Sequence, residues 1–141
     1  MDSNFRCSRR RAVIDRSDLS HVAYFFMTSS SSIDQELRAA DEAWKVGNEG
    51  KARVCARRAV ALAATAWSTR MGHTPWPGDV MERLRRIQQH AAFPVSVREA
   101  AERLSTAVTK RRAMPFTVDP LTDAGLIIRY LAAEARDYEL P

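Results

Sequence analysis

Residues 37–67 read LRAADEAWKVGNEGKARVCARRAVALAATAW, and this stretch decides the fold. Apolar residues recur at helical spacing before Gly47, which predicts a first helix over about Ile33–Val46. Gly47 stands where a helix favours a left-handed C-cap. A second helix is expected from Asn48 or Glu49 to about Arg70. Its inward stripe is small, so neighbouring helices can approach closely and this helix is predicted to be central; the stripe comprises Ala52, Ala56, Ala59, Ala63 and Ala66.

Three more amphipathic helices follow. The third is expected over about Val80–Ala92, with Asp79 as its N-cap and Pro94 ending the segment. The fourth begins at the capping box Ser96-Val97-Arg98-Glu99 and runs to Lys110-Arg111-Arg112. The fifth has Asp119 as cap and Pro120 in its first turn, and fades near Tyr138. The fold class is therefore predicted as all-α, an up-and-down bundle of about five helices, with the third and fourth as antiparallel neighbours.

The 141 residues fit one domain. Residues 1–32 are interpreted as a flexible, poorly structured N-terminal tail or linker, because they are charged and then serine-rich without a sustained period. Residues 33–140 are assigned to the helical-bundle domain, with Ser32 and Gln35 as a capping pair at its start. A further hypothesis makes Met27 the true first residue, which would place residues 1–26 outside the native protein.

Composition excludes several classes of protein. Hydrophobic residues make up 45% and charged residues 28%, which is typical of a globular chain and not of wholesale disorder. No apolar run approaches the roughly 20 residues of a membrane span, so no membrane association is expected. The two cysteines form no CxxC pair, and Cys55 is expected to be a small core residue. These features predict a cytoplasmic protein with no metal site and no cofactor.

Charge is distributed unevenly along the chain. Residues 51–112 carry 13 Lys and Arg against 4 Asp and Glu, whereas residues 33–50 and 113–141 each carry 2 against 5. One interpretation is internal pairing between the acidic flanking helices and the basic middle ones. The other is a phosphate-facing surface, for which the candidate nucleic-acid-binding or phosphate-binding residues are Arg53, Arg57, Arg58, Arg83 and Arg86, with Lys110–Arg112 beside them.

Few residues suggest catalysis. Arg85 and His90 have the spacing Arg-x-x-x-x-His, but at ~100° per residue they would lie about 140° apart on an unbroken helix. Arg86 and His90 would share a face. His73 lies in a loop without an evident partner for general-base chemistry.

Among the aromatic residues, Trp44 and Trp67 lie on inward stripes and are expected in the core. Trp76, in a loop, is expected to be the most exposed tryptophan. Residues 96–104 resemble the first helix of a helix-turn-helix, although no tight turn follows, so Arg98 and Arg103 are the candidates for reading DNA.

The hairpin formed by residues 39–44, the turn Gly47-Asn48-Glu49-Gly50 and the alanine-rich run from Ala52 resembles the opening of HEPN domains. That resemblance implies an α-helical bundle, which in many members is a ribonuclease or toxin component with an Arg-x4–6-His motif near the last helix. Here the last helix offers Arg129 and no following histidine. The resemblance therefore implies a non-catalytic binding module, possibly a homodimer, that engages a partner protein or nucleic acid. The alternatives are an RNA endonuclease using Arg85 and His90, and a DNA-binding regulator.

Overall fold

The computed structural model describes the backbone of residues 16–106 and 119–139, and the side chains of residues 30–106 and 119–138. Within these ranges all regular secondary structure is helical, which confirms the predicted all-α bundle. The helices are α1 (Arg16–Lys45), α2 (Glu49–Arg70), α3 (Val80–Gln89), α4 (Val95–Ser105) and α5 (Pro120–Glu139).

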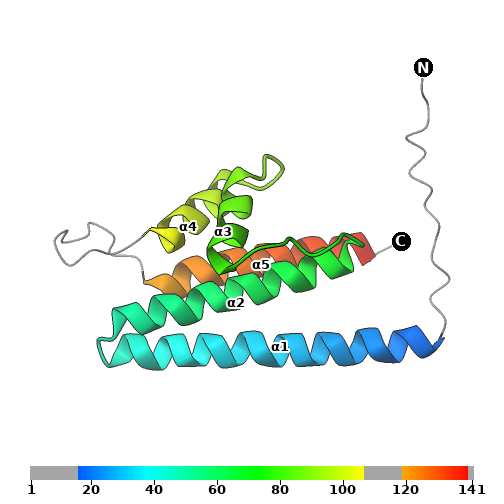
Figure 1. The fold of residues 1–141 in the computed structure, drawn as a ribbon, viewed down its shortest axis with the longest axis horizontal. Coiled ribbons are helices and arrows are strands. Elements are labelled where there is room, and N and C mark those ends of the chain that lie inside the picture. Colours follow the sequence, from blue (N-terminus) through cyan, green and yellow to red (C-terminus); the bar gives the residue numbers. More distant parts are fainter. Residues whose placement is uncertain (1–15, 107–118, 140–141) are drawn as a thin grey trace, which may run out of the picture.

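The helices pack around α2. Helices α1 and α2 form a long antiparallel hairpin, and α5 lies along α2 and runs in the same direction (Figure 1). The segment 71–79 leads back along α2 to α3, which with α4 forms a short pair across α2 and α5 (Figure 1). Helix α2 contacts each of the other four helices. The predicted central position of α2 is confirmed, and its alanines at 52, 56 and 59 are fully buried where neighbouring helices approach.

Local capping predictions hold at three helix starts and one helix end. Gly47 adopts φ +78°, the left-handed conformation that closes α1. Asn48 Oδ1 accepts a hydrogen bond from the Lys51 amide at 3.1 Å. Asp79 Oδ1 accepts one from the Glu82 amide at 2.9 Å, and Asp119 Oδ1 accepts one from the Thr122 amide at 2.9 Å. Each acceptor satisfies a donor that the first helical turn leaves unpaired.

Helix α1 begins earlier than predicted. Its first residue is Arg16, so residues 16–32 are helical and the expected tail does not extend to Ser32. Ser32 lies inside the helix and is not its N-cap. The reason is that residues 16–32 contain no glycine or proline, so the serines lower helix propensity only mildly and nothing stops the helix. Residues 1–15 lie outside the described residues.

The boundaries of α3 and α4 also differ from the prediction. Helix α3 ends at Gln89, and His90 has an extended backbone that opens a turn closed by the Phe93 amide donating to the His90 carbonyl at 3.0 Å. Helix α4 begins at Val95 after Pro94, with no side-chain cap, so Ser96 is its second residue. The rigid proline sets the entry into the helix, and the expected capping box is not used. Helix α4 ends at Ser105; Lys110–Arg112 lie outside the described residues.

The core joins all the helices. Trp67 and the free thiol of Cys55 are buried, as predicted, whereas Trp44 is only half-buried. Trp76 is half-buried rather than prominently exposed, because its ring packs 5.5 Å from that of Trp67. Fully buried aliphatic side chains connect α2, α3, α4 and α5; they include Val60, Leu84, Ile87, Leu104 and Ile127.

Candidate nucleic-acid interface

The predicted phosphate-binding arginines lie on two helices that contact each other. Arg53, Arg57 and Arg58 are on α2, and Arg83 and Arg86 are on α3. Arg58 and Arg86 are exposed, whereas the other three are half-buried. The five guanidinium groups therefore differ in their surroundings, and these surroundings separate structural roles from binding roles.

Arg57 connects α2 to the carboxyl end of α4. Its Nε donates to the Leu104 carbonyl at 2.7 Å, and its Nη2 donates to the Thr106 carbonyl at 3.2 Å. The last carbonyls of a helix have no partner within the helix, so this side chain satisfies them. Burial and, secondly, the positive charge of Arg53 lower the pKa of Arg57, which stays charged at neutral pH.

Arg83 connects α3 to α2 in a similar way. Its Nη1 donates to Thr65 Oγ1 at 3.2 Å. By contrast, Arg53, Arg58 and Arg86 make no hydrogen bond within the residues that the structure describes. The predicted surface thus contains two arginines with internal partners and three that keep their donors for a ligand or for water.

Internal pairing explains only part of the basic charge. Arg103 on α4 forms a short pair with the buried Asp123 on α5, with Nη2 and Oδ1 2.8 Å apart. This hydrogen bond is the main cause that raises the pKa of Arg103. Across the described part of the chain, Arg53, Arg58 and Arg86 form no ion pair with a carboxylate. Neutralisation by the acidic helices therefore holds for Arg103 and leaves these three cations unpaired.

The candidate catalytic residues lie in unlike surroundings. Arg85 is exposed on α3, whereas His90 follows the end of that helix and stacks on Phe93, with ring centroids 4.1 Å apart. His90 also lies 6.1 Å from the rings of Trp67 and Trp76. No hydrogen bond or ring contact joins Arg85 to His90 within the described residues. His73 is exposed, with its ring 6.1 Å from that of Trp67.

The aromatic cluster around Trp67 is a feature that sequence reasoning missed. The indole Nε1 of Trp67 donates to Glu134 Oε2 on α5 at 3.1 Å, and Phe93 packs edge-on against both Trp67 and Tyr130. Burial, and then the charge of Glu134, raises the pKa of Tyr130. A loop tryptophan between two prolines and a phenylalanine before a proline were the available signals. They indicate rigid connections that could carry buried rings.

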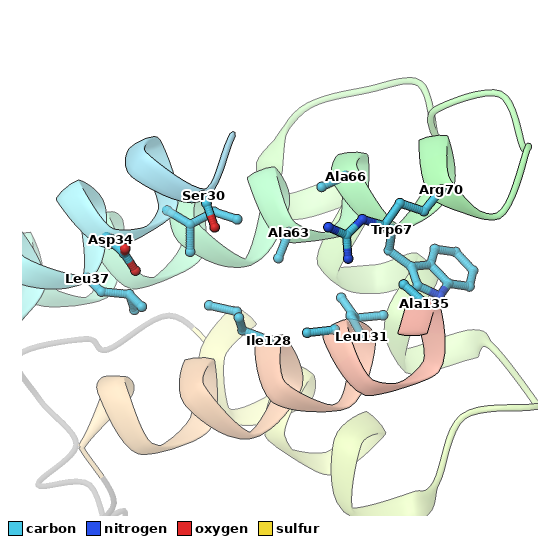
Figure 2. Close-up of a pocket in the computed structure, with 12 residues that line it drawn as sticks. Ser30, Asp34, Leu37, Ala63, Ala66, Trp67, Arg70, Ile128, Leu131 and Ala135 are labelled. Atoms are coloured by element: carbon cyan, nitrogen blue, oxygen red, sulfur yellow. The ribbon is translucent and has the colours of Figure 1, made fainter. Parts of the chain in front are cut away.

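A small pocket lies beside this cluster, between α1, α2 and α5. Its volume is about 180 Å³, below the several hundred Å³ of typical small-molecule sites. Figure 2 shows its mostly apolar wall, with Asp34 and Arg70 as the charged lining residues. Among the described residues, no group of His, Cys, Asp and Glu side chains could hold a metal ion. The chemistry on offer is therefore charge and hydrogen-bond donation by arginine.

Comparison with known proteins gives no match: no family model, no curated protein and no solved structure is similar to the chain. Among the described residues, no helix has the length and apolar character needed to cross a membrane.

Proposed function

We propose that the chain is a non-catalytic, HEPN-like helical module that binds nucleic acid through arginines of α2 and α3. The observation that carries this proposal is the set of cations without carboxylate partners, Arg53, Arg58 and Arg86, on two contacting helices. Unpaired guanidinium groups favour phosphate because their fork of donors matches its oxygens. Binding by a helical module of this kind needs no bound metal and no reactive side chain.

The RNA-endonuclease alternative has less support. The imidazole of His90 is stacked on Phe93 and enclosed by two indoles, and its Nδ1 is enclosed without a hydrogen-bond partner. A general acid or base needs hydrogen-bond reach to the reacting group. The DNA-regulator alternative relies on Arg98 and Arg103, and Arg103 is already held by Asp123.

Binding is tested with a fluorescein-labelled single-stranded RNA of 20 nucleotides, followed by anisotropy at about 50 mM salt. The triple variant Arg53→Gln, Arg58→Gln, Arg86→Gln removes the proposed contacts. The matched control removes three exposed arginines of α1 and α5: Arg38→Gln, Arg129→Gln, Arg136→Gln. Because each phosphate contact releases counterions, the first variant is expected to weaken affinity at least about tenfold and clearly more than the control. Equal losses in the two variants, or no binding by the unmodified protein, would contradict the proposal.

Catalysis is tested with the same RNA and a duplex DNA of equal length. Both are incubated with the unmodified protein and with His90→Ala, and the products are separated by denaturing electrophoresis. Intact RNA is expected in both samples. RNA cleavage that disappears in His90→Ala would establish the endonuclease instead. Tighter binding of the duplex DNA than of the RNA, with Arg98→Gln reducing it, would favour the DNA-binding regulator.

A further inference from the structure

Two of the arginines on α2 stand one helical turn apart. Arg53 and Arg57 are separated by four residues, a spacing that places their Cβ atoms about 5–6 Å apart on one side of the helix. Their charges are close enough that Arg53 contributes to the lowered pKa of Arg57. Like charges at this spacing repel each other, so the pair weakens α2 unless an anion lies between them.

Within the described residues, neither guanidinium has a carboxylate to balance it. The Nε of Arg53 is enclosed by the protein and has no hydrogen-bond partner. An enclosed cationic donor without an acceptor is costly, since the group has lost its water and gained nothing in exchange. The structure thus holds a donor that lacks an acceptor, next to a second positive charge.

Arg57 is held in place by the α4 carbonyls. Its Nε and Nη2 are used by Leu104 and Thr106, which fixes the plane of the guanidinium and leaves Nη1 without a partner in the described part of the chain. A cation that is fixed before binding loses little side-chain entropy when the ligand arrives. Arg58 and Arg86 are exposed and have no such support.

We infer that Arg53 and Arg57 form an oxyanion site that takes one phosphate group, with Arg53 donating from Nε and Arg57 donating from Nη1. This inference rests on the proposed function, because it identifies the phosphodiester of bound nucleic acid as the ligand. It also goes beyond that function, since it separates one built phosphate site from the exposed charges around it. The same chemistry would accept free inorganic phosphate with lower affinity.

The test follows arginine Nε–Hε signals of the full chain by ¹⁵N NMR at pH 6.5. Inorganic phosphate is titrated against sodium chloride at equal ionic strength. The Arg53 and Arg57 signals are expected to shift in a saturable way, and that of Arg129, whose Nε donates to the Gly125 carbonyl, is expected to stay constant. RNA affinity is then measured for Arg53→Gln, Arg53→Lys and the control Arg129→Gln. Circular dichroism verifies that each variant is folded.

Arg53→Gln is expected to lose about tenfold in RNA affinity at low salt, and Arg53→Lys to recover only part of it, because lysine keeps the charge but not the fork. If RNA binds but the two signals stay constant, and Arg53→Gln resembles Arg129→Gln, the oxyanion site is wrong and the proposed function stands. If phosphate shifts both signals but RNA does not bind, the site stands and the proposed function is wrong.

Discussion

The buried pair Arg103–Asp123 joins α4 to α5, and Asp123→Ala is expected to destabilise the protein strongly. The Asp123 side chain is 5% exposed and accepts from Arg103 Nη2 at 2.8 Å and from Nε at 3.1 Å. Removing one partner of a fully buried pair costs about 3–5 kcal/mol, because the remaining charge is left uncompensated. The Arg103 side chain is 30% exposed, so water solvates part of its charge. The expected loss is therefore about 2–3 kcal/mol.

Urea unfolding followed by tryptophan fluorescence and by circular dichroism measures this loss. Coincident curves from the two probes would justify a two-state treatment. Asp41→Ala is the control, since it breaks the exposed Asp41–Lys45 pair and should leave the midpoint essentially unchanged. The double variant Asp123→Leu, Arg103→Met replaces both charges with apolar groups and should recover most of the loss. A midpoint for Asp123→Ala equal to that of Asp41→Ala would refute the reasoning.

Three more predictions concern stability. Leu104→Ala removes a fully buried side chain and should cost about 3–5 kcal/mol in urea unfolding, whereas Val46→Ala, at a 79% exposed position, should change almost nothing. The raised pKa of Tyr130 means that the folded state holds its phenolic proton more tightly, so stability should fall as the pH rises from about 10 through the folded-state pKa. Tyr130→Phe should flatten that fall in thermal melts; an unchanged pH dependence would count against the burial of the phenol. Gly78→Ala should lower the melting temperature by several degrees, because φ is +100° and the new Cβ would strike the Glu82 side chain; an unaltered melt would contradict this strain.

Local features of the fold were predictable because each depends on neighbours in sequence. Gly47 and Asp119 hold the predicted positions because helix ends need left-handed backbone and side-chain acceptors within a few residues. The start of α1 was missed because weak helix formers without a breaker permit two answers. Ser96 failed as a cap because the adjacent Pro94 had already set the entry.

The site was predictable as a charge excess and not as a geometry. Residue counts place Arg53 and Arg57 on a basic helix. They do not show that Arg57 reaches Leu104, 47 residues further along the chain, or that Arg53 Nε is enclosed without a partner. His90 likewise fits a motif by spacing, whereas its stacking on Phe93 depends on where α3 stops. Tertiary packing decides which members of a charged set are available to a ligand.

The most direct test of phosphate binding by the unpaired arginines is the slope of log Kd for single-stranded RNA against log salt concentration. The slope is measured for the unmodified protein and for Arg53→Gln, Arg58→Gln, Arg86→Gln. Each lost phosphate contact should reduce it by about 0.7, so the triple variant should fall by about 2. Equal slopes for the two proteins would contradict the account.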